Sequence, residues 1–154
     1  MKLPALCLVV LMPAWFAAAS ASAAAADPND IERLLDAIAR IESRGDPTAV
    51  GDGGRALGAY QIHRGYWEDG TELLGVDWPH RDAADPKKAR RVVKAYLLHY
   101  GRGKSLLEMA RIHNGGPRGD QKKATLPYAQ KILADGSLSA GLHAPQFSHL
   151  FIRF

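Results

Sequence analysis

The feature that most constrains the fold is a helical repeat of apolar residues near the start of the chain. Five apolar residues recur at helical spacing within the segment 28–43: Ile31, Leu34, Leu35, Ile38 and Ile41. This spacing places them on one face of a helix. Asp27 and Pro28 stand just before the repeat and suit a helix cap and a first helical position. The sequence therefore predicts a helix over 28–43 that buries one face in a core.

Disulfides are not expected to hold that core. The single cysteine, Cys7, lies within an N-terminal stretch typical of a secretory signal: Lys2, then the apolar run "LPALCLVVLMPAWF", then the small residues "AAASASAAAA". The run is too short for a membrane span. We expect residues 1–26 to be this signal, with cleavage after Ala23 or Ala26. The expectation is a secreted or periplasmic protein with no stable membrane insertion after cleavage.

The remaining chain is predicted to form one domain, over 27–136, followed by a tail, 137–154, without a periodic pattern. Glycine and proline crowd into 45–54, and "RALGAYQI" then predicts one arm of a short hairpin. Helical patterns follow at 65–75, 86–100, 105–113 and 125–136. The predicted class is α+β, predominantly helical, with four or five helices and a small hairpin.

Glu42 ends the first predicted helix on its apolar side, because it follows Ile38 by four residues and Leu35 by seven. Burial against apolar side chains disfavours the charged carboxylate, so the expectation is a pKa raised to about 6. A protonated glutamic acid could donate a proton to a glycosidic oxygen. The alternative is a glutamate that turns to water or pairs with Arg40 or Arg44.

Asp52 lies among Gly51, Gly53 and Gly54, where flexible, polar surroundings favour the ionised form. Together with Glu42 it would give the unequal pair of carboxylates found in glycosidases. The alternative is an ordinary turn aspartate, since Asp-Gly is a common hairpin turn.

Other chemistries find little support in the residues. The six histidines show no metal-ligand spacing, and the chain has no phosphate loop and no Gly-x-Ser-x-Gly sequence. No metal, cofactor or nucleic-acid partner is expected, and the chain is expected to be a monomer. The formal charge of +4 suits an anionic polymer such as a bacterial wall, but is also ordinary for a secreted protein.

The segments "RIESRGD", "GAYQIHRGYWEDG", "ARIHNGGPRG" and "TLPYAQKI" together resemble the invertebrate-type lysozymes, also called the destabilase family. The resemblance covers residues 37–133. It implies a lysozyme-like fold and hydrolysis of the bond between N-acetylmuramic acid and N-acetylglucosamine in peptidoglycan glycan strands. In that family a glutamate before a serine is the acid, and an aspartate before G-x-x-Q-I is the second carboxylate. These positions fall on Glu42 and Asp52.

The resemblance further implies a set of residues that border the sugar cleft: Tyr60, Gln61, Ile62, Tyr66, Trp67, Tyr100, His113, Asn114 and Gly115. Animal members are rich in disulfides, so the loop that carries Asp52 must be held here by other means. A mechanism with retention would need the two carboxyl groups roughly 5 Å apart.

Two alternatives stay open. The stretch "ESRGDPTAVGDGGRALGAYQI" is also similar to the lytic transglycosylases, which use one glutamate as acid and then base and form an anhydro sugar. The other alternative is a wall-binding module that keeps the fold without turnover. The glutamate on the core face argues against this last interpretation, because burying a carboxylate without a use is costly.

Overall fold

The computed structural model describes residues 28–136 and residue 138. The predicted signal and nearly all of the predicted tail therefore lie outside the described residues. The α-helices are α1 (Pro28–Ser43), α2 (Arg64–Leu74), α3 (Pro86–Tyr100), α4 (Leu106–Gly115) and α5 (Leu126–Ala134). The strands are β1 (Val50–Gly51), β2 (Ala56–Leu57) and β3 (Ile62–His63). Single 3-10 turns cover Asp52–Gly54, His80–Ala84, Gly119–Gln121 and Lys123–Thr125. This arrangement confirms the predicted helical α+β class.

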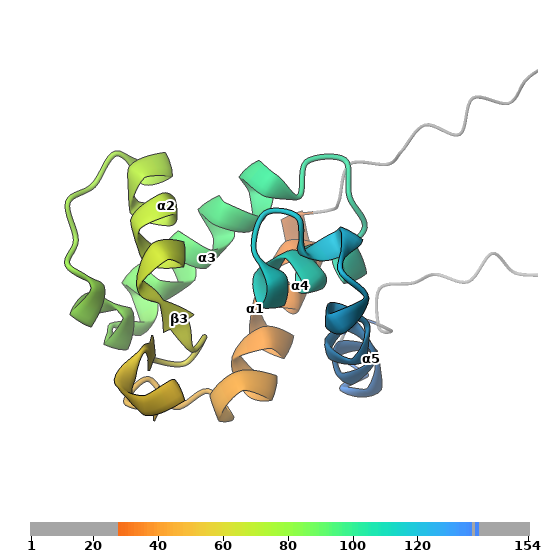
Figure 1. The fold of residues 1–154 in the computed structure, drawn as a ribbon, viewed down its shortest axis with the longest axis horizontal. Coiled ribbons are helices and arrows are strands. Elements are labelled where there is room, and N and C mark those ends of the chain that lie inside the picture. Colours follow the sequence, from red (N-terminus) through yellow and green to blue (C-terminus); the bar gives the residue numbers. More distant parts are fainter. Residues whose placement is uncertain (1–27, 137, 139–154) are drawn as a thin grey trace, which may run out of the picture.

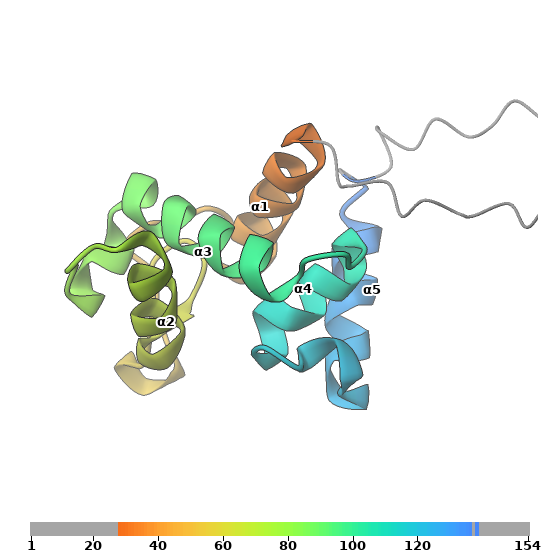
Figure 2. The ribbon, with the colours of Figure 1, turned by 90° about the horizontal axis from the view of Figure 1, so that it is seen from above.

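The elements form two groups joined by α1 and α3. The sheet and α2 lie at one side of the molecule, and α4 and α5 lie at the other (Figure 1). Turned by 90°, the molecule shows α3 running between α2 and α4 (Figure 2). Helix α3 contacts both of these helices, and α1 contacts α3, α4 and α5. None of the described helices has the length and apolar character needed to cross a bilayer.

The core lies where these helices meet. The predicted apolar face of α1 is buried, with Leu34, Leu35 and Ile38 fully inaccessible to solvent. They pack in one cluster with residues of the other helices and of β3, including Ile62, Trp67, Val92, Val93, Leu97, Ile112 and Ile132. Burying a side chain of this size contributes about 1.5 to 3 kcal/mol. The apolar repeat of α1 therefore fixes the position of the helix end that carries Glu42.

Side-chain caps mark the starts of α3 and α4. The Asp85 carboxylate accepts hydrogen bonds from the backbone N–H groups of Lys87 and Lys88 at the start of α3. Ser105 and Glu108 form a reciprocal capping box at the start of α4. These caps satisfy N–H groups that the first helical turn leaves without partners.

The small sheet is more elaborate than the predicted hairpin. Its three antiparallel strands pair Val50 with Leu57 and Ala56 with His63. The stretch "RALGAYQI", expected to be one arm, instead holds β2, a tight turn and the first residue of β3. Gly58 permits this turn because its φ is +74° and a Cβ there would lie 1.9 Å from the carbonyl oxygen of Ala83.

Candidate active site

The end of α1 is fixed against the sheet, and this places Glu42 in the centre of the molecule. Gly45, with φ +83°, donates its N–H to the carbonyl of Ala39 at 2.9 Å and so closes the helix. The Ser43 hydroxyl donates to the carbonyl of Ala59 at 2.9 Å. This bond joins the last residue of α1 to the turn before β3. It therefore holds Glu42, the residue before Ser43, beside the sheet.

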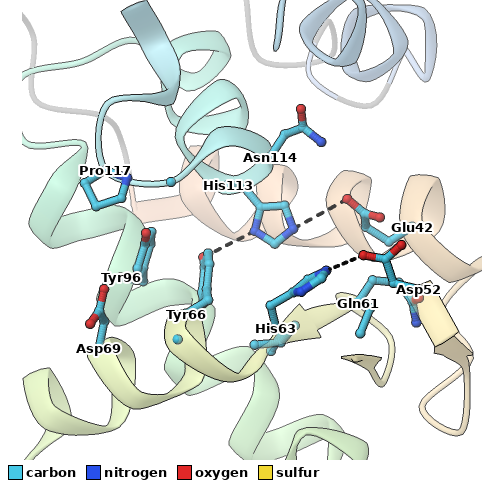
Figure 3. Close-up of a pocket in the computed structure, with 14 residues that line it drawn as sticks. Glu42, Asp52, Gln61, His63, Tyr66, Asp69, Tyr96, His113, Asn114 and Pro117 are labelled. Carbon is cyan, nitrogen blue, oxygen red and sulfur yellow. Dashed lines mark hydrogen bonds and ion pairs between the residues drawn. The ribbon is translucent and has the colours of Figure 1, made fainter. Parts of the chain in front are cut away.

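Glu42 and Asp52 line one cleft of about 580 Å³. Its lining comes from α1, the sheet, α2, α3 and the end of α4: Glu42, Asp52, Ala56, Gln61, Ile62, His63, Gly65, Tyr66, Asp69, Tyr96, His113, Asn114, Gly116 and Pro117. Figure 3 shows both carboxylates at the same side of the cleft, with Tyr96 and Asp69 at the other. No lysine or arginine belongs to this lining, although the chain carries a formal charge of +4.

The surroundings of Glu42 reverse the expected direction of its pKa. Burial is the largest single effect and raises the pKa of Glu42, but several neighbours, of which His113 is the strongest, together outweigh it. The Tyr128 hydroxyl and the Lys131 charge lower it further, so the pKa lies below its ordinary value. The expected rise to about 6 is therefore wrong. The carboxylate on the apolar face of α1 is mostly buried, as predicted, with 21% of the Glu42 side chain exposed. Burial alone does not set its pKa.

Tyr128 is a neighbour of Glu42 that the sequence analysis did not identify. It lies on α5 and is buried. Its hydroxyl has no hydrogen bond of normal geometry among the described residues. Burial, together with the nearby Glu42 carboxylate, raises the pKa of Tyr128, so the phenol keeps its proton and directs a donor towards the carboxylate.

Asp52 lies in the turn between β1 and β2 and is held by charge instead of disulfides. Its backbone adopts φ +55°, an uncommon conformation for a residue with a side chain. Its carboxylate lies 3.1 Å from His63 Nε2 and 3.6 Å from an Arg55 nitrogen. About half of the side chain is exposed. Asp52 is thus an accessible carboxylate at the cleft, fixed by two neighbours.

Five of the residues expected to border a sugar cleft belong to the lining of the cleft described above: Gln61, Ile62, Tyr66, His113 and Asn114. Gln61 has φ +48°, and its amide nitrogen donates to the carbonyls of Ala49 and Gly58. These bonds join both ends of the segment that contains the Asp52 turn. Gln61 therefore braces that turn as well as facing the cleft.

The other four do not belong to this lining. Tyr60 and Trp67 are core residues, 3% and 1% exposed. The Tyr60 hydroxyl contacts Arg90, and the Trp67 indole N–H donates to the carbonyl of Trp78. Tyr100 packs against Tyr96 and His99 outside the cleft lining. A Cβ on Gly115 would meet Thr125. Aromatic composition could not distinguish a sugar platform from a core side chain.

Three polar or aromatic residues of the lining were not foreseen: His63, Asp69 and Tyr96. His63, Tyr66 and Asp69 follow one another at a spacing of three along the start of α2. Residues at this spacing share one face of a helix, so this pattern could have identified them. Tyr96 stacks on Tyr66 with ring centroids 3.7 Å apart, a contact between α2 and α3 that local spacing does not reveal.

The described residues, 28–136 and 138, contain no group of three or more histidine, cysteine, aspartate or glutamate side chains able to hold a metal ion. The groups of the cleft lining that can exchange a proton are carboxyl, imidazole and phenol groups: Glu42, Asp52, Asp69, His63, His113, Tyr66 and Tyr96.

Comparisons with known proteins identify relatives of two kinds. Residues 19–134 match the model of the transglycosylase SLT domain. Lysozyme 1 of Crassostrea virginica is 39% identical over 85 residues, covering 53% of this chain and 45% of that protein. A lysozyme of Ostrea edulis is 38% identical over 89 residues, with 54% and 64% covered. The chain thus spans about half to two thirds of the length of these oyster relatives.

A nematode relative is covered more fully. Invertebrate-type lysozyme 6 of Caenorhabditis elegans is 35% identical over 109 residues, which cover 61% of this chain and 78% of that protein. Together with the helical fold and the cleft at the end of α1, these matches assign the chain to the transglycosylase SLT domain family and to the invertebrate-type lysozymes.

Proposed function

We propose that this protein cleaves peptidoglycan glycan strands by hydrolysing the β-1,4 bond between N-acetylmuramic acid and N-acetylglucosamine. The observation that carries the proposal is the position of Glu42. Its carboxyl group lies in the cleft, mostly shielded from water, with His113 and Tyr128 beside it. The names of the oyster and nematode relatives support the same substrate class. Export through the expected signal would bring the protein to this substrate.

In the proposed reaction, the protonated form of Glu42, which its lowered pKa confines to acidic pH, donates its proton to the glycosidic oxygen as the bond to the sugar carbon breaks. Asp52 attacks that carbon or stabilises the positive charge that develops on the sugar. Glu42, now a carboxylate, removes a proton from water. The water oxygen then bonds to the sugar carbon with retention, either as the bond from Asp52 to that carbon breaks or by adding to the sugar cation that Asp52 stabilises. Arg55 and His63 lie beside the Asp52 carboxylate and hold it at the cleft.

A second candidate is a lytic transglycosylase that uses Glu42 alone. The matching family model is named for transglycosylases, and the exposure of Asp52 beside Arg55 and His63 also suits a structural aspartate. In this route Glu42 first acts as the acid. It then removes the proton of a hydroxyl group on the same muramic acid, which closes an anhydro ring without water.

Replacing Glu42 tests the site common to both routes. Glu42→Gln keeps the size of the side chain and removes the transferable proton, so the rate of wall cleavage should fall about 100- to 10,000-fold. Glu72→Gln is the matched control, because Glu72 is exposed on α2 and does not line the cleft. Undiminished cleavage by a folded Glu42→Gln protein would contradict the assignment. Binding of the wall without any cleavage by the unmodified protein would contradict both routes.

Mass spectrometry of the digested wall separates the two routes. Hydrolysis gives reducing muramic ends, which are heavier by one water than the anhydro ends that a transglycosylase forms. Asp52→Asn adds a second criterion. We expect reducing ends from the unmodified protein and a severe loss of rate in Asp52→Asn, whereas anhydro ends with a near-normal rate in that variant would establish the transglycosylase route.

A further inference from the structure

His113 is buried between two groups that can exchange hydrogen bonds with both of its ring nitrogens. The residue is 9% exposed and lies on α4. Its Nδ1 is 3.2 Å from the hydroxyl oxygen of Tyr66, and its Nε2 is 3.6 Å from Oε1 of Glu42. Figure 3 shows the imidazole between these partners, with Tyr66 at one nitrogen and Glu42 at the other. The ring therefore links α2 to the end of α1.

The partners define which nitrogen of a neutral His113 carries the proton. Tyr66 keeps its hydroxyl proton, because burial raises its pKa well above the ordinary value. The hydroxyl can donate to Nδ1, which leaves the ring proton on Nε2, facing the Glu42 carboxylate. In the opposite tautomer, an unprotonated Nε2 would face a carboxylate oxygen, an unfavourable contact between two acceptors. The arrangement favours the first tautomer.

The distance between His113 Nε2 and Glu42 Oε1 is slightly longer than that of a hydrogen bond. At 3.6 Å, Nε2 and Oε1 are farther apart than in a normal hydrogen bond, and a movement of about half an ångström would close it. Catalytic hydrogen bonds are often long before substrate binds. The Tyr66 ring fixes the imidazole from the other side, because it contacts His113 edge to face and stacks on Tyr96.

We propose that His113 is a positioning residue for the general acid: its Nε2–H holds Oε1 of Glu42, so that the transferable proton resides on Oε2, and Tyr66 fixes the imidazole in the required tautomer. This inference rests on the proposed function of Glu42. It assigns His113 to the acid and not to direct sugar binding, the role expected from the resemblance.

The general acid needs a proton on Glu42, so every titratable or charged group near its carboxyl group bears on this inference. The other groups that face Glu42 and His113 are Tyr66 on α2 and Tyr128 and Lys131 on α5, with Asp52 and His63 elsewhere in the cleft lining. Of these, Tyr128 and Lys131 also lower the pKa of Glu42.

Replacement of His113 by phenylalanine separates positioning from mere packing. His113→Phe removes both ring nitrogens and with them the strongest effects that lower the pKa of Glu42. Burial, which raises this pKa, then meets less opposition. The titration midpoint of the Glu42 carboxyl carbon, followed by NMR with labelled glutamate, should move to higher pH. The alkaline limb of kcat/KM should move in the same direction, and kcat should fall about tenfold or more. Loss of a residue that only packs would lower activity without moving the Glu42 titration midpoint or the alkaline limb of kcat/KM.

Three further variants sharpen this test. Tyr66→Phe keeps the ring stacked on Tyr96 and removes only the hydroxyl. The Glu42 midpoint and the alkaline limb of kcat/KM should move to higher pH, but by less than in His113→Phe. This variant also provides the test if His113→Phe does not fold. Lys131→Met should raise the Glu42 midpoint without lowering the maximal kcat, since it changes charge and not position. His99→Phe, at an exposed histidine of α3, should leave the midpoint and the alkaline limb in place.

Unchanged Glu42 midpoints in folded His113→Phe and Tyr66→Phe would overturn the inference. A different result would overturn the proposed function instead. If the midpoint moves as expected while Glu42→Gln cleaves peptidoglycan normally, the contact between His113 and Glu42 stands and Glu42 is not the acid.

Discussion

At the scale of single residues, Tyr128 offers a direct test of what surrounds Glu42. Its hydroxyl is buried, has no hydrogen bond of normal geometry among the described residues, and lowers the pKa of Glu42. Tyr128→Phe should therefore raise the pKa of Glu42 and move the alkaline limb of kcat/KM to higher pH. Stability should change by less than about 1 kcal/mol, because the hydroxyl makes no hydrogen bond of normal geometry and its removal leaves no buried donor unsatisfied. A pH–rate profile and urea unfolding measure both quantities.

The direction of the Glu42 pKa marks the limit of sequence reasoning at this scale. The spacing of Leu35, Ile38 and Glu42 correctly predicts that the carboxylate is shielded, since these residues share one face of α1. The groups that outweigh burial, His113 and Tyr128, lie on α4 and α5, far along the chain. No local pattern could place them against Glu42, because only the packing of three helices brings them together.

At the scale of elements, the junction between the sheet and the turn before α3 depends on Gly58. A Cβ at this position would lie 1.9 Å from the Ala83 carbonyl oxygen, and its φ of +74° is unfavourable for alanine. Gly58→Ala should therefore lower the free energy of unfolding by about 2 to 5 kcal/mol. Urea unfolding of the whole chain measures this change.

Gly65→Ala is the matched control for this prediction. Gly65 lies in α2, its φ is not positive, and a Cβ added there would meet no atom within 4 Å. Alanine favours a helix, so this variant should be unchanged or more stable by up to about 1 kcal/mol. Equal stability of the two variants would show that the contact with Ala83 does not constrain the turn.

The helices could be predicted from the sequence more fully than the sheet. Apolar repeats with capping signals, such as Asp85 before α3, define an element by residues close in sequence. The strands contain two residues each, too few for an alternating pattern to register. Tyr60 and Trp67 lie next to the strands in the sequence, and their polar groups form hydrogen bonds with Arg90 and Trp78, which later segments contribute.

At the scale of the whole molecule, the charges are distributed unevenly with respect to the cleft. The cleft lining contains three carboxylates, Glu42, Asp52 and Asp69, and neither lysine nor arginine. Arg118, Lys122 and Lys123 are exposed in the segment that follows Pro117 at the cleft edge. A net positive charge outside a cleft of this kind would attract an anionic wall without placing a cation at the scissile bond.

This distribution predicts a salt dependence that differs between substrates. Attraction between exposed charges is screened at high ionic strength, where the Debye length falls from about 10 Å at 0.1 M to about 3 Å at 1 M. Cleavage of an intact anionic wall should therefore slow several-fold as salt rises over this range, mainly through KM. Cleavage of a short, uncharged N-acetylglucosamine oligomer, if the cleft accepts it, should change much less, because the oligomer carries no charge for the exposed cations to attract. Replacing Arg118 and Lys123 by serine should weaken the salt dependence on the wall and leave the oligomer rate unaltered. An equal salt effect on both substrates would instead place the sensitive charges within the cleft, where Asp52 and His63 form the exposed ion pair.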